Sequence, residues 1–258
     1  MHLRSYSVPM KHKRIFLFFL LNLFSILAYS QQTSKPSISI IIDDLGYKQK
    51  EDILALSLPG PIAYAILPHA PYTKKIATIA SQNGKEILLH QPMQALENND
   101  LLGPGALTLN MTQKEFVKTL EKNISVISNI IGINNHMGSL LTRHPGHMQW
   151  LMNVLKKNEY IYVDSLTSTN SVAGEIAKKN KIPFLKRDIF LDNNTDLEYI
   201  TKKFLELIAL AKEEGTALAI AHPHSNTIKI LSKFLQNIDS YGVKLIGIKS
   251  LIRIRNNK

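Results

Sequence analysis

Acidic and histidine side chains, the kind that bind metal ions, follow several apolar runs of this sequence. These are Asp43-Asp44 after residues 38–42, His90 after 86–89, His136 after 132–135 and His222 after 217–221. Two adjacent aspartates at the end of a buried strand repel each other, and a neighbouring cation relieves that repulsion. Asp and His supply the oxygen and nitrogen ligands that suit zinc, and also cobalt, manganese or nickel. The pattern therefore favours a divalent metal site.

Each of these residues also has a purely structural interpretation. An Asp after a strand often caps the next helix, and a single His at a strand end is more often a hydrogen-bonding partner than a ligand. Three such His together with an Asp pair favour the metal. We expect the His residues that lack this combined context to lie on the surface or behind the site: His2, His12, His69, His144 and His147.

The elements that must position these residues alternate regularly along the chain. Short runs rich in Ile, Val and Leu are separated by longer amphipathic stretches, and the strand candidates are residues 38–42, 62–66, 86–89, 132–135, 161–163, 183–186, 217–221 and 244–248. Their near-continuous hydrophobicity is typical of strands covered on both faces. Repeated β–α units predict an α/β fold with a parallel sheet, open or closed into a barrel. The carboxyl ends of such strands meet on one face, where active sites form.

Several residues predict where the helices begin and end. Thr112-x-x-Glu115 and Thr195-x-x-Glu198 have the spacing of a capping box, and Pro145 suits a first helical turn. Gly215 and Gly242 fall where helices should stop.

The first thirty residues have the pattern of a secretory leader. A basic segment with Lys11, Lys13 and Arg14 precedes an apolar run over residues 15–27, and small residues follow at Ala28 and Ser30. The run is shorter than the roughly 20 residues that span a membrane. We expect a signal peptide, export to the periplasm and no transmembrane segment after cleavage; an uncleaved N-terminal anchor is the alternative.

The domain organisation follows from this leader. We expect a signal peptide over residues 1–30, a short linker over 31–36 and one domain over 37–258. No Cys is present, so any metal site must use His, Asp or Glu. The formal charge of +11 falls to about +7 without the four basic residues of the leader. No arginine-rich, aromatic-interleaved patch indicates nucleic acid. The basic surface is either simply solvated or attracts an anionic envelope polymer.

The motifs around the candidate site closely resemble those of the divergent polysaccharide deacetylases, exported bacterial proteins related to the NodB-type deacetylases. The segments that carry the resemblance are residues 41–47, 89–93, 134–139, 164–165, 187–192 and 221–223. The resemblance implies a single distorted (β/α)7-type barrel, NodB-like, with mostly parallel strands. It also implies a metal-assisted hydrolysis that removes acetyl groups from an acetylated cell-envelope polysaccharide.

The resemblance further implies roles for individual residues. Asp43 matches the general base, while Asp44 and His90 match metal ligands. The second histidine of the usual motif is replaced by Gln94, and we expect His136 to supply the missing ligand.

The remaining roles concern the second half of the chain. His222 resembles the late histidine that serves as general acid, oriented by a carboxylate such as Asp164 or Asp188. Arg187 either pairs with Asp43 and keeps it ionised or forms a structural ion pair. Asp192 is expected to cap or turn a loop.

Two other classes of function remain open at this point. One is a non-catalytic envelope protein that binds glycan on the same barrel. The other is a different metal hydrolase, such as a peptidoglycan amidase or a phosphoesterase. Tyr47, Tyr64 and Tyr72 are candidates for stacking on sugars or, equally, for packing. The oligomeric state is not predicted.

Overall fold

The computed structural model describes residues 1–2 and 35–256. The chain divides into two units, residues 1–34 and 35–258, and the second is described here. The signal peptide expected over residues 1–30 and most of the linker lie outside the described residues. Within the described part of the chain, no helix combines the length and hydrophobicity needed to cross a membrane.

The core of the fold is a curled sheet in which all paired strands are parallel. The strands are β1 Ser37–Leu45, β2 Ala63–Ile66, β3 Glu86–Met93, β4 Ile130–Met137, β5 Ile161–Asp164, β6 Phe184–Lys186, β7 Ile189–Phe190, β8 Thr216–Ala221 and β9 Lys244–Leu245. Their order is β6-β5-β4-β3-β2-β1-β8-β7, and β9 pairs with the start of β1. The predicted α/β fold with parallel strands is confirmed, and the sheet has nine strands among the described residues in place of about seven.

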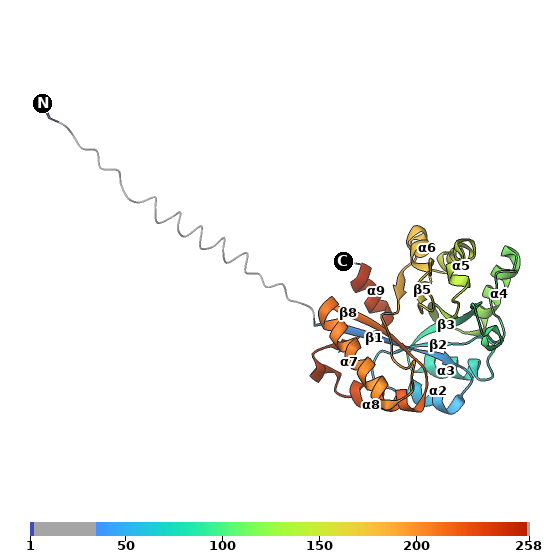
Figure 1. Cartoon of the computed structure of the whole chain (residues 1–258), viewed down its shortest axis with the longest axis horizontal. Coiled ribbons are helices and arrows are strands. Elements are labelled where there is room, and N and C mark those ends of the chain that lie inside the picture. The colour runs from blue at the N-terminus through green and yellow to red at the C-terminus, as the bar shows by residue number, and fades with distance from the viewer. Residues whose placement is uncertain (3–34, 257–258) are drawn as a thin grey trace. The chain divides into compact units, whose positions relative to one another are not determined.

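Helices surround this sheet (Figure 1), and all but α9, which packs against the inner face, cover its outer face. They are α2 Gln49–Leu56, α3 Thr73–Gln82, α4 Gln113–Val126, α5 Pro145–Lys157, α6 Ala173–Asn180, α7 Leu197–Glu214, α8 Ser225–Leu235 and α9 Ile248–Asn256. Three short 3-10 turns are η1 Asn99–Leu101, η2 Leu141–Arg143 and η3 Ile238–Tyr241.

The chain itself crosses the gap between the two ends of the sheet. β6 pairs with β5, two residues follow, and β7 then pairs with β8 at the opposite end. The crossing residues are Arg187 and Asp188. Because one extended segment joins both ends in this way, the sheet curls into a distorted barrel rather than an open, flat sheet.

Apolar side chains fill both faces of the curled sheet. One core lies between the sheet and the outer helices and contains Ile40 and Ile42. The other lies on the inner face, where Ile41 packs with Leu88 and with residues of α9. Successive strand residues point to opposite faces, so the alternation along β1 separates the two cores.

The predicted helix boundaries have mixed outcomes. The capping box at Thr112 is present, Pro145 begins α5, and Gly215 ends α7 in the left-handed conformation. The box predicted at Thr195 is wrong, because Asp196 is the N-cap of α7 and its side chain makes no capping hydrogen bond. The last predicted strand is too long, since β9 stops at Leu245 and Ile248 begins α9.

Candidate metal-binding and catalytic site

The candidate site continues the inner-face row of the sheet at the carboxyl ends of the strands. Ile41, Leu88 and Ile220 belong to the inner core. Because side chains alternate in a strand, the residues two positions later occupy the same face. These later residues are Asp43, His90 and His222. A two-residue period therefore places an acid and two histidines above one apolar floor.

Asp44 reaches the same side as Asp43 because β1 is irregular there. The pairing of β1 with β2 shifts between Ile42 and Leu45, as in a β-bulge, and Asp44 has a positive φ of 61°. A regular strand would direct adjacent side chains to opposite faces, and a bulge redirects one of them. Asp and Asn tolerate this left-handed φ better than other L-residues, so an Asp at position 44 suits the irregular backbone.

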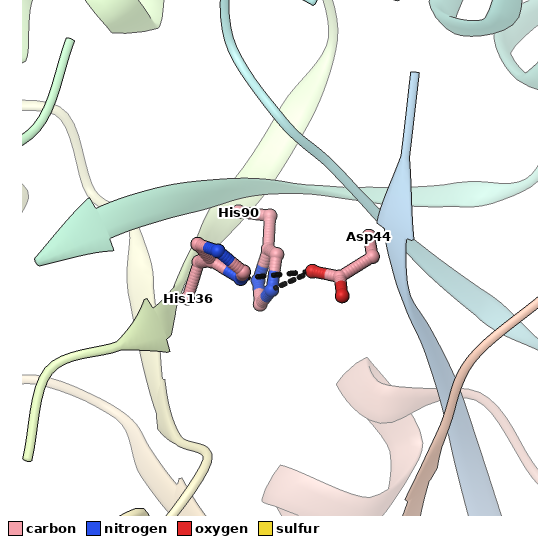
Figure 2. A group of neighbouring side chains, drawn as sticks. All are labelled: Asp44, His90 and His136. Carbon is pink, nitrogen blue, oxygen red and sulfur yellow. Dashed lines mark ion pairs between the residues drawn. The ribbon is translucent and has the colours of Figure 1, made fainter. Parts of the chain in front are cut away.

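Asp44, His90 and His136 converge on one point (Figure 2). Asp44 Oδ1 lies 3.0 Å from His90 Nε2 and 2.9 Å from His136 Nδ1. Although two ring nitrogens are this close, Asp44 Oδ1 is buried and makes no hydrogen bond of good geometry within the described residues. Two ring nitrogens and a carboxylate oxygen that meet without hydrogen bonding form the donor set that a divalent cation binds.

A buried amide lies behind this group. Asn134 Oδ1 is 2.9 Å from His90 Nδ1, and Asn134 Nδ2 donates to Asp43 Oδ1 at 2.8 Å. The register explains the first contact, because His90 and Asn134 are paired across β3 and β4. The sequence motif around Asn134 was noted, but no role was predicted for this side chain.

His222 is held by Asp192, not by either predicted carboxylate. Its Nδ1 lies 3.0 Å from Asp192 Oδ1, and its backbone N–H donates to Asp192 Oδ2 at 2.7 Å. Thr227 Oγ1 also donates to Asp192 Oδ2 at 2.8 Å. His222 Nε2 is left on the side of Asp44, at 3.6 Å from Oδ2. Asp192 thus caps a loop backbone N–H, as expected, and in addition holds the His222 ring, which was not predicted.

The two carboxylates predicted to orient His222 have other partners. Asp164 accepts hydrogen bonds from Ser171 Oγ and from the N–H of Leu166. Asp188 accepts from the N–H of Leu218 and forms an ion pair with Arg255. Both are thus committed to holding the fold, and neither contacts His222 among the described residues.

Arg187 lies in the wall of the site without a carboxylate in direct contact within the described residues. Its Nε and Nη2 donate to the carbonyls of Ser165 and Leu166 at 2.8 and 3.0 Å. Its guanidinium stacks over Phe190, 5.0 Å from the ring centroid. Burial lowers the pKa of Arg187, and the nearby charges of Asp164 and Asp43 only partly offset this. The predicted interaction with Asp43 is therefore through space rather than a contact pair.

The two adjacent acids have pKa values displaced in opposite directions. Burial raises the pKa of Asp43, and the nearby His90 and His222 only partly offset this. Burial also disfavours ionised Asp44, but the approach of His136 and His90 outweighs it and lowers the pKa of Asp44 well below its usual value. Such a split between neighbouring groups is characteristic of acid–base assignments in active sites.

The histidines respond to the same charges. Burial works against protonation of His90, yet Asp43 and Asp44 together raise its pKa. Burial likewise opposes protonation of His222, but the contact with Asp192 and the charge of Asp44 raise the pKa of His222 to about 9.

Two cavities meet at the candidate metal group and share Asp44, His136 and His222. One, of about 400 Å³, is also lined by Asp43, Ser165 and Arg187. The other, of about 310 Å³, has an apolar wall that includes Tyr47, Leu67 and Leu101. Of the three tyrosines considered for sugar stacking, Tyr47 lines a cavity, while Tyr64 is buried and donates its hydroxyl to Ala55.

Gln94, which stands where the usual second histidine would be, has a structural role. Its Oε1 accepts from the N–H of Leu109 at 2.7 Å, and its backbone N–H donates to Leu107. His136 occupies the corresponding place in the Asp-His group.

This parallel α/β architecture is that of the NodB-like barrels. An uncharacterized protein ATU2773 from Agrobacterium tumefaciens C58 has a similar structure, with a TM-score of 0.81 and 23% identity over 86% of this chain and 91% of that one. The peptidoglycan deacetylase PdaC from Bacillus subtilis matches with a TM-score of 0.54 and 11% identity, over 88% and 94% of the two chains. BA3943 from Bacillus anthracis, a CE4 family pseudoenzyme, matches with a TM-score of 0.55 and 10% identity, over 86% and 66%.

Sequence comparison defines the family. The model of the divergent polysaccharide deacetylases matches residues 40–252, and the chain therefore belongs to this family. An uncharacterized protein from Haemophilus influenzae is 36% identical over 220 residues, which cover 85% of this chain and 78% of that protein.

Proposed function

We propose that this protein is an exported, metal-dependent hydrolase that deacetylates an acetylated polysaccharide of the cell envelope. The convergence of Asp44, His90 and His136 beside Asp43 and the His222–Asp192 pair carries this proposal. Membership of the divergent polysaccharide deacetylase family supports the substrate class. The expected leader over residues 1–30 supports export to the periplasm.

The residues present fit a divalent cation. Asp44 Oδ1 is a buried oxygen without a hydrogen-bond partner among the described residues, and two ring nitrogens lie within 3.0 Å of it. The donor set contains only nitrogen and oxygen, which suits Zn²⁺ and also Co²⁺, Mn²⁺ or Ni²⁺. A cation held there would polarise the acetyl carbonyl and acidify the attacking water.

The protein side chains supply the proton transfers. Asp43 would accept the proton of the attacking water, and its raised pKa makes it a more effective base near neutral pH. His222, with a pKa of about 9, carries a proton at neutral pH and would donate it to the leaving amine. Asp192 holds the His222 ring so that Nε2 faces the site.

Arg187 supports this arrangement from the cavity wall. Its guanidinium is held by two backbone carbonyls and by Phe190, so its charge remains at a fixed distance from Asp43. We assign it an electrostatic role, in which it favours the ionised form of Asp43 before each cycle.

The test combines metal analysis with product analysis. Purified protein is expected to retain about one zinc or comparable ion per chain, measured by elemental mass spectrometry after gel filtration. It is then expected to release acetate from N- or O-acetylated envelope glycans. Glycan binding by metal-loaded protein without acetate release would contradict the enzymatic proposal and favour a glycan-binding protein. Cleavage of peptide–sugar or phosphate bonds, identified by product mass, would contradict the deacetylase assignment.

A further inference from the structure

Asn134 connects the two chemical halves of the candidate site. The side chain is fully buried, and its two ends contact different groups. Its Oδ1 is 2.9 Å from His90 Nδ1, and its Nδ2 is 2.8 Å from Asp43 Oδ1 and 3.4 Å from Ser165 Oγ. One amide therefore touches both a candidate metal ligand and the candidate base.

The two ends of an amide are chemically distinct, and this fixes the protons of both partners. Asp43 Oδ1 accepts from the Asn134 amide NH₂, so the carbonyl oxygen of Asn134 faces His90. That oxygen can only accept, and His90 Nδ1 must then carry the hydrogen. In neutral His90, Nε2 is consequently the unprotonated nitrogen, and it lies 3.0 Å from Asp44 Oδ1. An unprotonated nitrogen directed at a carboxylate oxygen is unfavourable until a cation lies between them.

We propose that Asn134 is a positioning residue that selects the metal-binding tautomer of His90 and at the same time holds Asp43 by donating to it. The inference rests on the proposed function, since it assumes a cation at Asp44, His90 and His136. It assigns to one neutral side chain two tasks, ligand orientation and base orientation, which a single exchange can separate.

The substitution that separates the two tasks, orientation of His90 and orientation of Asp43, is Asn134→Asp. A carboxylate has nearly the same shape and still accepts from His90 Nδ1, but it offers no N–H to Asp43 and adds a like charge beside it. If the new carboxylate at position 134 and Asp43 share one proton, Asp43 is no longer free to act as the base. Asn134→Leu removes both contacts, and Asn134→Ser serves as the replacement variant where Asn134→Leu does not fold.

The chain offers a matched control for the chemical change. Asn123 is also fully buried, its Oδ1 lies 2.8 Å from His69 Nε2, and its Nδ2 donates to Gln91 Oε1 at 2.8 Å. Asn123→Asp thus exchanges an amide for a carboxylate at an equally buried Asn that contacts a half-buried His outside the Asp-His group.

The experiment measures zinc affinity by competition with a chelating dye, together with acetate release, on full-length variants matched for thermal stability. Asn134→Leu is expected to weaken zinc binding roughly 10–100-fold, the usual effect of losing a partner of a metal-bound His. Asn134→Asp is expected to bind zinc at least as tightly as the wild type. Its turnover is expected to fall roughly 10²–10⁴-fold, the range attributed to general acid–base catalysis. Asn123→Asp should leave zinc affinity unchanged.

The outcomes distinguish a failure of the proposed function from a failure of the role proposed for Asn134. Absence of zinc binding by the wild-type protein would overturn the proposed function and this inference with it. Zinc binding by the wild type that is unchanged in Asn134→Leu and in Asn134→Ser would overturn the inference alone. Equal losses of zinc affinity in Asn134→Asp and Asn134→Leu would also overturn it, because a hydrogen-bond acceptor for His90 Nδ1 would then make no difference to zinc binding.

Discussion

Two asparagine–histidine networks, each built on a buried asparagine, can be compared within the described residues, and they differ as a candidate functional site differs from a structural one. Asn134 joins His90 to Asp43, and Asn123 joins His69 to Gln91. Their contact distances are nearly the same. The first network ends in two acids at the meeting point of two cavities. The second ends on a neutral amide and the backbone carbonyl of Gly105.

The two networks satisfy their polar groups to different degrees. Asn123 Nδ2 donates to both Gln91 Oε1 and Gly105 O, and Gln91 Nε2 donates in turn to Gly105 O and Pro92 O. By contrast, the first network leaves Asp44 Oδ1 buried without a hydrogen bond and places Asp44 at a positive φ. A fully satisfied network rigidifies the fold, whereas a partly satisfied one beside a cavity indicates a missing partner.

The largest expected contrast between the networks is in metal affinity. Asp44→Asn and His136→Ala are each expected to abolish measurable zinc binding while the fold stays intact. Both remove a proposed direct ligand, so the loss should exceed the roughly 10–100-fold expected from losing an outer partner. His69→Ala, the control in the second network, should bind zinc like the wild type. Circular dichroism tests whether the fold is intact, and elemental mass spectrometry measures the zinc content. Normal metal content in both site variants would refute the ligand assignment.

The second contrast is in stability. Asn123→Leu leaves Gln91 Oε1 without its buried partner, which costs about 1–3 kcal/mol, and also removes the contact to His69 and one of the two hydrogen bonds to the Gly105 carbonyl. We expect the free energy of unfolding in urea to fall by about 3 kcal/mol in total. Zinc affinity per folded molecule should not change. Stability equal to that of the wild type would show that this network is not the structural one.

A third prediction tests whether burial of acids near the site has a pH-dependent cost. Asp52 is fully buried, accepts from the N–H of Gly46 just after Asp44, and its Oδ1 has no partner among the described residues. Burial raises the pKa of Asp52 to about 6. A carboxyl whose folded-state pKa is raised stabilises the fold below its unfolded pKa near 4 and loses this contribution as the pH rises through about 6.

The measurement for Asp52 is chemical unfolding across this pH window. Asp52→Asn should be more stable than the wild type at pH 8 by about 1–3 kcal/mol, since roughly two pKa units correspond to just under 3 kcal/mol and the new amide is not fully paired. The difference should shrink toward pH 4. A constant difference between pH 4 and 8 would contradict the raised pKa.

The sequence predicted that Asp43, His90 and His222 come together because polar residues that directly follow apolar strand runs are a local signal. The pairing of His222 with Asp192, by contrast, depends on a contact between segments far apart in the sequence. β7 is only Ile189–Phe190, too short to predict, yet its pairing with β8 brings the N–H of Leu191 to the carbonyl of Ile220 and so places Asp192 beside His222. Asp164 and Asp188 were equally plausible from sequence, since nothing local distinguishes the three acids.

The boundary between β9 and α9 was missed for a similar reason. Glu86, at the start of β3, accepts hydrogen bonds from the N–H groups of Ile248 and Lys249. A carboxylate from a strand far away in sequence thus satisfies the first turn of α9, where a local capping residue would otherwise be expected. Residues 244–248 therefore have the apolar pattern of one strand, but only Lys244–Leu245 form β9, and Ile248 already begins α9.

The last contrast concerns the segment around Gly105, which the structural network holds and where no effect on metal affinity is expected. Gly105 has a φ of 83°, and a Cβ there would lie 2.5 Å from Asn123 Oδ1, so Gly105→Ala should lower the free energy of unfolding by about 1–3 kcal/mol. The same segment carries Leu101, which lines the apolar cavity beside Asp44. A loosened segment should weaken glycan binding, so KM for acetate release should rise while zinc affinity and kcat stay close to wild type. Zinc affinity that fell together with stability would show that the two networks are coupled, and the distinction between a structural and a functional network would have to be abandoned.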